Sequence, residues 1–349
     1  MSDVSKVVLK VEHLVKHFAI RHSRDVVHAV NDVSFGVHSG ETLALVGESG
    51  SGKTTVGRCL LRLIDPTSGR ILFNGQDIAK LSPKEFRQLR PRIQMVFQEA
   101  YDSLNPRLSI RQILEENLIL EGHLDQRQRE ARILELVEMT RLPRGLLDHY
   151  PHELTSSEQQ RVGIARALST QPNLVVLDEP TSALDITVRA EIINLLRDLQ
   201  RESGVAYVFI SHDLTAVREI SHRVVIMYLG EIAEVAPNPA IFDYQLHPYG
   251  QALLASVLFP DPDAIYANVS LEGEIPSPVH LPKGCHLHPR CPFTLPVCSS
   301  EWPVPRSFDG TRVAACHRAH EFLPEEVVRA GRPLMAREVA LASANPQRG

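Results

Sequence analysis

The residues best suited to chemistry lie in a glycine-rich stretch near the start of the chain. Residues 47–54 read Gly-Glu-Ser-Gly-Ser-Gly-Lys-Thr, which fits the pattern G-x-x-x-x-G-K-[ST]. Glycines let the backbone curl until successive N–H groups point inward at phosphate oxygens. The lysine then reaches the outer phosphates of a nucleotide, and the next hydroxyl ligates Mg²⁺. We therefore predict a P-loop for ATP or GTP, with Thr54 as a Mg²⁺ ligand, made of Gly47, Ser49, Gly50, Ser51, Gly52, Lys53, Thr54 and Thr55.

An acidic pair, Asp178 and Glu179, directly follows the apolar residues 173–177. A carboxylate at the end of a buried strand near a P-loop holds Mg²⁺ or its water, so Asp178 is a predicted ligand of the nucleotide site. Glu179 could polarise an attacking water as a general base. Because solvation alone explains such a pair poorly, we predict that both residues are functional.

Three other side chains carry weaker signals. Gln98 ends a predicted strand and could complete Mg²⁺ coordination or orient water, although a glutamine at a strand end is usually just solvated. His212 follows another predicted strand and could touch the γ-phosphate, although a lone histidine is more often structural. Phe18 could stack on adenine, and packing in a small β layer explains it equally well.

Short apolar runs predict the strands that position these residues. Residues 43–46 form such a run before the P-loop, and a helical pattern follows Lys53. Residues 109–142 carry apolar side chains at helical spacing without any strand pattern, which predicts an all-helical insertion over about residues 100–168. The other predicted strands are 7–12, 26–35, 69–74, 92–97, 173–177, 205–210, 224–228 and 231–235, the last two as a hairpin.

Length and composition limit the class of protein. The chain has 349 residues, of which 43% are apolar, and a net charge of −5, so we predict no nucleic-acid partner. No apolar run approaches the ~18 residues that cross a bilayer, and the N-terminus has no secretory pattern. We therefore expect a cytoplasmic protein that reaches a membrane only through a partner. No internal repeat is present, which indicates a single nucleotide-binding unit.

Composition changes near residue 255. Of the 24 prolines, 16 lie at or after Pro237, and four of the five cysteines lie between residues 285 and 316. We predict a nucleotide-binding domain at residues 1–255 and a Pro-rich C-terminal extension at residues 256–349. The fifth cysteine, Cys59, follows the P-loop and is expected to be a small core residue.

The four cysteines of the extension are spaced C-x5-C-x6-C-x17-C. Disulfides are rare in the cytoplasm, whereas four thiolates suit zinc or an iron–sulfur cluster. The spacing lacks the C-x2-C pairs of zinc knuckles. From the residues alone, zinc, a cluster and no metal remain open for Cys285, Cys291, Cys298 and Cys316.

Together, these motifs resemble an ABC-type ATPase over roughly residues 7–255. The resemblance rests on the P-loop, Gln98, the helical insertion, the acidic pair, residues 182–185 and His212. Residues 45–53, 98–107 and 246–249 resemble the oligopeptide/dipeptide subfamily of importer ATPases more narrowly. The resemblance implies an α/β fold with a RecA-like P-loop core, an antiparallel β layer, a helical subdomain and a Cys-containing C-terminal extension.

The resemblance also implies roles for the candidate residues. Phe18 becomes the adenine-stacking position, Gln98 the ligand of Mg²⁺ and water, and Asp178 the carboxylate on the Mg²⁺ side. Glu179 becomes the catalytic base of ATP hydrolysis and His212 the γ-phosphate switch. ATP and Mg²⁺ are the implied cofactors. The four-cysteine region is similar to the extension of peptide-importer ATPases, some of which hold a [4Fe–4S] cluster.

Partners follow from the same resemblance. Members of the subfamily work as paired ATPases on the cytoplasmic face of the inner membrane. They lie beneath two transmembrane permease subunits, and a periplasmic solute-binding protein feeds these. The segment after Gln98 would lie near the groove that receives a coupling helix of the permease. The imported solute follows from subfamily resemblance alone, so peptides, nickel, sugars and other small solutes remain open.

One departure from the family is large. The family signature Leu-Ser-Gly-Gly-Gln is here Leu154-Thr155-Ser156-Ser157-Glu158. Side chains replace glycines where a phosphate must approach, and Glu158 adds a repelling charge. Because the signature serves the partner's P-loop, we expect a heterodimer with a second ATPase that has an intact signature. The alternatives are slowed turnover, a regulatory ATP-binding subunit, and a soluble ABC ATPase outside transport.

Overall fold

The computed structural model describes residues 6–256, 269–308 and 310–324. Its contacts divide the chain into two units that alternate along the sequence. Unit 1 contains Met1–Val8, Val37–Thr42 and Lys80–Ile220, and unit 2 contains Leu9–Gly36, Leu43–Ala79 and Ser221–Gly349. Within the described ranges, no helix combines the length and apolarity needed to cross a bilayer.

Unit 1 is built on three parallel strands in the order β8-β7-β6. Val96 lies opposite Leu177, and Asp178 lies opposite Ile210, so the three strands end together. Strands β7 and β8 are buried along their whole length, as continuous apolar runs in a parallel sheet require. The elements of unit 1 are α2 (Pro83–Leu89), β6 (Ile93–Val96), α3 (Ala100–Ser103), α4 (Ile110–Glu121), α5 (Gln126–Met139), α6 (Ser156–Leu168), β7 (Leu174–Asp178), α7 (Ile186–Ser203), β8 (Ala206–Ile210) and α8 (Leu214–Ile220).

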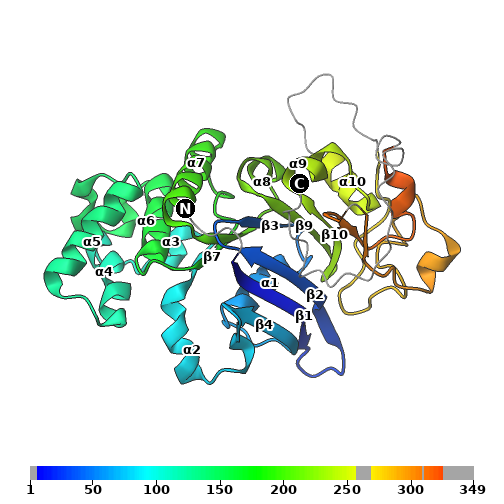
Figure 1. Ribbon diagram of the computed structural model, residues 1–349, viewed down its shortest axis with the longest axis horizontal. Helices are drawn as coiled ribbons and strands as arrows, with labels where there is room; N and C mark the ends of the chain where they lie inside the picture. The colour runs from blue at the N-terminus through cyan, green and yellow to red at the C-terminus, as the bar shows by residue number, and fades with distance from the viewer. Residues whose placement is uncertain (1–5, 257–268, 309, 325–349) are drawn as a thin grey trace. The chain divides into compact units, whose positions relative to one another are not determined.

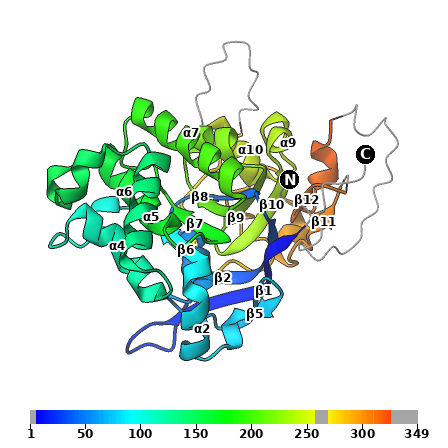
Figure 2. The ribbon, with the colours of Figure 1, turned by 60° about the vertical axis from the view of Figure 1, so that its left-hand side comes forward.

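Helices α4, α5 and α6 lie side by side in unit 1 (Figures 1 and 2). The predicted helical stretch 109–142 is two helices, because the chain turns between them. Gly122 ends α4 in the left-handed conformation, and Asp125 begins α5 with a capping box. Gly122 and Asp125 carry no apolar side chain, so the apolar pattern alone did not separate the two helices.

Unit 2 contains two sheets. The first has the strand order β2-β1-β4-β5 and lies mainly in this unit. The second follows the order β11-β12-β10-β9-β3, with β3 parallel to β9 and the other pairs antiparallel. The elements are β1 (Val7–Ala19), β2 (Val26–His38), β3 (Thr42–Val46), α1 (Lys53–Leu60), β4 (Ser68–Phe73), β5 (Gln76–Asp77), β9 (Arg223–Tyr228), β10 (Glu231–Pro237), α9 (Asn238–Asp243), α10 (Pro248–Ala255), β11 (Arg306–Ser307) and β12 (Val313–Ala314).

Strand β1 is longer than its pattern indicated. It continues past a bulge between Glu12 and Val15 and pairs again with β4, where Val15 lies opposite Ser68. His17 and Phe18 are therefore part of a strand that extends beyond the predicted range 7–12. The predicted hairpin of β9 and β10 is confirmed, and its two-residue turn has positive φ at Leu229 and Gly230, as such turns require.

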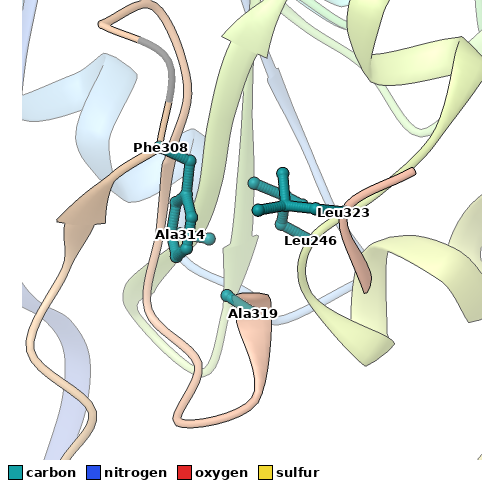
Figure 3. Close-up of a cluster of buried hydrophobic side chains, with 5 residues drawn as sticks. All are labelled: Leu246, Phe308, Ala314, Ala319 and Leu323. Carbon is teal, nitrogen blue, oxygen red and sulfur yellow. The ribbon is translucent and has the colours of Figure 1, made fainter. Parts of the chain in front are cut away.

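The described part of the C-terminal extension packs onto unit 2. Strand β12 pairs with β10, with Val313 opposite Val235. Five buried apolar side chains fill the space beside this pair (Figure 3), namely Leu246, Phe308, Ala314, Ala319 and Leu323. The boundary at residue 255 stays a prediction, and residues 257–268, 309 and 325–349 of the predicted extension lie outside the described part.

A buried ion pair lies between β10 and the extension. Arg312 and Glu234 are both fully buried, with a guanidinium nitrogen 3.9 Å from the carboxylate. Arg312 stacks over the Tyr244 ring and donates to the Tyr244 carbonyl at 2.8 Å. Glu234 accepts from the backbone N–H groups of Leu246 and His247. Because neither charged group is in contact with water, the protein groups around it must stabilise its charge. Arg312 of the extension and Glu234 of β10 are therefore part of the same buried polar network.

Candidate nucleotide-binding site

The loop of residues 47–52 joins the buried strand β3 to helix α1, as the sequence predicts. Gly47, Gly50 and Gly52 all have positive φ. A Cβ atom on Gly47 would lie 2.2 Å from the Met227 carbonyl oxygen, and one on Gly52 would lie 2.4 Å from that of Ala29. Only glycine fits at these two positions, so the loop keeps its curled backbone.

The ammonium group of Lys53 lies inside the curl of this loop. It donates to the carbonyl of Gly47 at 2.8 Å, to that of Glu48 at 2.9 Å and to the hydroxyl of Ser51 at 3.2 Å. The side chain is buried, so its charge is concentrated where backbone N–H groups also converge. An anion bound by the loop would meet this charge directly.

The mouth of the loop is open to solvent. Ser49 and Gly50 are exposed, while Thr54 and Thr55 are half-buried in the first turn of α1. No side chain caps the N-terminus of α1, whose cap residue is Gly52 in the left-handed conformation. The positive end of the helix therefore faces the same opening as the loop.

Three groups of Glu48, namely its N–H, its carbonyl and its carboxylate, each contact another residue, and the sequence did not indicate these contacts. Its N–H donates to the Tyr249 hydroxyl at 2.7 Å, and its carbonyl accepts from Lys53. Its carboxylate lies 3.5 Å from the guanidinium of Arg290, in the C-terminal extension. No local pattern could indicate these contacts, because Tyr249 and Arg290 are 201 and 242 residues away in sequence.

The acidic pair ends strand β7 in unit 1. Asp178 is buried, whereas Glu179 has a positive φ of 46° and turns away from the strand direction. The N–H of Glu179 donates to the Ile210 carbonyl at 2.9 Å, which holds this backbone against β8. Such a conformation in a residue other than glycine costs on the order of 1–3 kcal/mol and is concentrated at functional sites.

His212 lies beside Glu179, because β7 and β8 end together. Its Nδ1 atom is 3.2 Å from Glu179 Oε1, with the histidine side chain 62% exposed and the glutamate 16% exposed. Gln98 follows β6, the other neighbour of β7, and is exposed. Unit 1 thus carries Gln98, Asp178, Glu179 and His212 after three adjacent parallel strands, where ligands of open α/β sheets bind.

Phe18 belongs to unit 2, as the P-loop does. Its ring is 38% exposed on β1, and the Lys16 ammonium lies 4.8 Å from the ring centroid. An exposed aromatic face is available for stacking. Within the described residues, the contacts of Phe18 do not include the P-loop, so its adenine role stays a prediction.

The altered signature forms the N-terminus of α6. The Thr155 hydroxyl accepts from the Glu158 N–H, and the Glu158 carboxylate accepts from the Thr155 N–H at 2.8 Å. This capping box places a full negative charge at the positive end of the helix. Ser156 is exposed between the two capping residues.

The four cysteines of the extension are all reduced and lie near one another. Burial, together with the charge of the neighbouring cysteines, raises the pKa of the Cys285 and Cys316 thiols to about 12. Cys285 also donates its N–H to the Cys298 carbonyl at 2.9 Å. Among the described residues, however, no three His, Cys, Asp or Glu side chains are arranged to hold a metal ion. Cys59 is fully buried, as expected for a core residue.

A phosphate-binding loop after a buried strand and a strand-terminal acidic pair define the class of P-loop nucleotide hydrolases. Residues 30–182 match the ABC transporter family, and residues 233–298 match the C-terminal region of the oligopeptide/dipeptide transporter family. The chain belongs to the ABC transporter family of ATP-binding proteins and is an ABC-type ATPase.

Curated relatives resemble the chain along most of its length. A probable peptide ABC transporter ATP-binding protein, y4tS of Sinorhizobium fredii, is 49% identical over 90% of both chains. The oligopeptide transport ATP-binding protein AppF of Bacillus subtilis is 44% identical over 89% of this chain and 97% of its own. The similarity thus includes the extension as well as the nucleotide-binding part.

Solved structures match the ABC ATPase fold. The ATP-binding cassette MJ0796, solved as a dimer bound to ADP and phosphate, has a TM-score of 0.61 and 30% identity, covering 66% of this chain and 98% of its own. The protein cbiO1 of Clostridium perfringens has a TM-score of 0.62 and 28% identity, covering 68% and 92%. The predicted α/β P-loop ATPase fold is confirmed.

Proposed function

We propose that this chain is the ATP-hydrolysing subunit of an ABC importer for peptides or related small solutes. The observation that carries the proposal is the curled loop around Lys53, in a chain 49% identical to a peptide ABC transporter ATP-binding protein. The match of residues 233–298 to the oligopeptide/dipeptide transporter family supports transport rather than a soluble ABC ATPase. The left-handed Glu179 beside His212 supports turnover rather than a purely regulatory role.

The proposal gives each residue of the site a task. Lys53 and the N–H groups of residues 47–54 bind the outer phosphates, and Phe18 stacks on adenine. Thr54 and Gln98 hold Mg²⁺, whose positive charge offsets that of the phosphates, with Asp178 on the same side. The hydroxyl and amide oxygens of these residues are the hard donors that Mg²⁺ prefers.

Glu179 is the general base under this proposal. Its carboxylate accepts a proton from the attacking water, and the contact with His212 holds the carboxylate oriented. Because His212 is largely exposed, a γ-phosphate could compete with Glu179 for its ring. That competition gives the predicted switch a physical basis.

Substitution of the base separates binding from hydrolysis. We expect Glu179→Gln to bind ATP with wild-type affinity, because the amide keeps the size of the side chain. Turnover should fall by roughly a hundredfold or more, since the amide cannot accept the proton. The measurement is steady-state phosphate release with Mg-ATP, beside a titration with a fluorescent ATP analogue.

Glu202→Gln is the matched control, because Glu202 is an exposed glutamate of α7. It should hydrolyse ATP at the wild-type rate. Wild-type turnover in Glu179→Gln would remove Glu179 from the role of base. If Lys53→Ala lost ATP binding while Glu179→Gln kept its turnover, the chain would bind ATP through the P-loop but would not use Glu179 as its general base.

The altered signature supports a pair of unequal ATPases. The P-loop and acidic pair of this chain are complete, so a partner with an intact signature would finish a competent site. The site that this chain completes for the partner is weak, because Glu158 places its carboxylate at the N-terminus of α6. A heterodimer with one competent and one weak site follows.

The four cysteines are proposed to bind a [4Fe–4S] cluster, with zinc as the alternative. Their thiol chemistry and their mutual proximity support this role, although the described side chains do not form a closed ligand set. Metal analysis and the visible spectrum of anaerobically purified protein would decide it. If the purified protein contained neither iron nor zinc and showed no charge-transfer band, the proposal of a bound metal would be refuted.

The proposed partners are a second ABC ATPase, two transmembrane permease subunits and, indirectly, a periplasmic solute-binding protein. The proposed location is the cytoplasmic face of the inner membrane. The names of the relatives support these partners, since both include peptide transport.

A further inference from the structure

One side chain of the C-terminal extension contacts the phosphate-binding loop. Arg290 Nη1 lies 3.5 Å from Glu48 Oε2 and 3.4 Å from the Tyr228 hydroxyl. The Arg290 side chain is only 10% exposed. A guanidinium stays protonated in proteins, so Arg290 places a positive charge beside the Glu48 carboxylate.

The segment that carries Arg290 is itself fixed by backbone hydrogen bonds. The Arg290 N–H donates to the Leu287 carbonyl at 2.9 Å, and the Arg290 carbonyl accepts from Glu272 at 3.4 Å. Next to the guanidinium, the rings of Tyr228 and Tyr249 pack with centroids 4.7 Å apart. The arginine is therefore held by its own backbone and by Tyr228, which packs against Tyr249, and it is not a free surface side chain.

Glu48 transmits this contact to the loop. Its N–H is bound by Tyr249 and its carbonyl by Lys53, so a shift of Glu48 would also move the ammonium group that meets the phosphates. Its carboxylate is a negative charge within a loop that binds a polyanion. The nearby guanidinium offsets that charge, and without it the carboxylate would repel the nucleotide.

We propose that Arg290 is a positioning residue for nucleotide binding, which neutralises Glu48 and braces the phosphate-binding loop from the C-terminal extension. This inference rests on the proposed function, because it assumes that the loop binds ATP. It assigns the extension a part in the nucleotide site through a side chain other than the cysteines.

The test is ATP affinity in the full-length protein. Arg290→Gln should weaken the binding of a fluorescent ATP analogue by roughly 3- to 10-fold at low salt, and less at high salt as the charge is screened. The loss should be larger for ATP than for ADP, since ATP carries more charge. Arg318→Gln is the matched control, because Arg318 is another ion-paired arginine of the extension, bound to Glu321, and its loss should leave affinity unchanged.

A second background distinguishes this role from loss of folding. In Glu48→Gln protein, which has no charge to neutralise, adding Arg290→Gln should change ATP affinity less than twofold. An equal loss in both backgrounds, or wild-type affinity in Arg290→Gln, would overturn the inference. Failure of the wild-type protein to bind ATP would instead refute the proposed function itself.

Discussion

Glu158 caps the N-terminus of helix α6. Its negative charge would also repel a phosphate that approached this helix end. A glutamine at this position also completes a capping box, so Glu158→Gln should keep the α6 N-terminus. Loss of the charge should cost about 0.3–1 kcal/mol of helix stabilisation. It should raise ATP turnover of the complete transporter several-fold, because repulsion at the weak site is removed. The measurement is phosphate release by the purified complex.

A nearby glutamate provides the control for this prediction. The Glu153 carboxylate accepts from the Tyr150 N–H at 2.6 Å in a similar cap just before α6. Glu153→Gln should leave turnover unchanged. If Glu158→Gln hydrolyses ATP no faster than Glu153→Gln, the charge at the signature does not limit the weak site.

His247 makes the stability of unit 2 depend on pH. Burial lowers the pKa of this histidine to about 4, from 6.5 in a solvated histidine. Between these values the unfolded chain binds more protons, so His247 contributes stability above pH 6.5 that is lost as pH falls toward 4. The full effect is about 3 kcal/mol. Its ring accepts from the Tyr249 N–H at the start of α10, so charging it disturbs that helix.

His247→Asn tests this dependence, because asparagine can also cap α10. The free energy of unfolding, from urea titrations at pH 4.5 and 7, should change less with pH in the variant than in the wild type. Glu234, whose pKa burial raises to about 7, has the opposite sign, and His286 has the same sign as His247. Glu234 and His286 are present in both the wild type and the variant. If the free energy of unfolding depended equally on pH in the two proteins, His247 would be excluded as the cause.

Arg312, between β11 and β12, is paired with Glu234 of β10 and so stabilises the packing of these strands. Arg312→Met removes the buried cation and leaves Glu234 without it, which should cost about 3–5 kcal/mol of unfolding free energy. Arg306→Met, at an exposed position of β11, should stay within about 0.5 kcal/mol of wild type. Thermal denaturation of both variants measures the difference.

Removing the second charge should reverse part of this loss. In Arg312→Met/Glu234→Gln no buried charge remains unpaired, so the double variant should be more stable than Arg312→Met alone. A double variant as unstable as the sum of two independent losses would mean that packing, and not charge, is what Arg312 supplies.

The expected assembly of this chain with its partners can be tested by co-purification. Tagged protein recovered from detergent-solubilised membranes should bring with it two multispanning proteins and a second ATPase whose signature contains Ser-Gly-Gly-Gln. The reason is that a homodimer would complete both of its sites with the altered signature, whereas a partner with an intact signature would complete the site of this chain. Recovery only as a homodimer from the soluble fraction would contradict both the importer and the unequal pair.

Local patterns were enough to predict the P-loop, the buried strands and the β9–β10 hairpin, because neighbouring residues determine each of them. The left-handed Glu179 was not predictable in this way. A residue before proline ordinarily prefers an extended backbone. Here the hydrogen bond of its N–H to the Ile210 carbonyl holds another conformation, and that bond exists only once β7 and β8 have paired.

Contacts between distant segments were beyond the sequence. Nothing in the Pro-rich region indicates that β12 joins β10, since β12 has only two residues. The contact of Arg290 with Glu48 is hidden for the same reason, because its two residues have no pattern in common. The sequence indicated which side chains could carry the chemistry, and those roles stay predictions. It left open which contacts hold these side chains in place.

The pairing of β12 with β10 has a consequence for solubility. Without the extension, β10 would be an edge strand, with the backbone groups of Glu234 and Val235 open to another chain. Flat, apolar edges of this kind recruit strands from neighbouring molecules and lead to aggregation. A protein shortened after residue 255 would keep the residues of the phosphate-binding loop but lose Arg290. It would also aggregate more readily, because the extension covers the edge of β10.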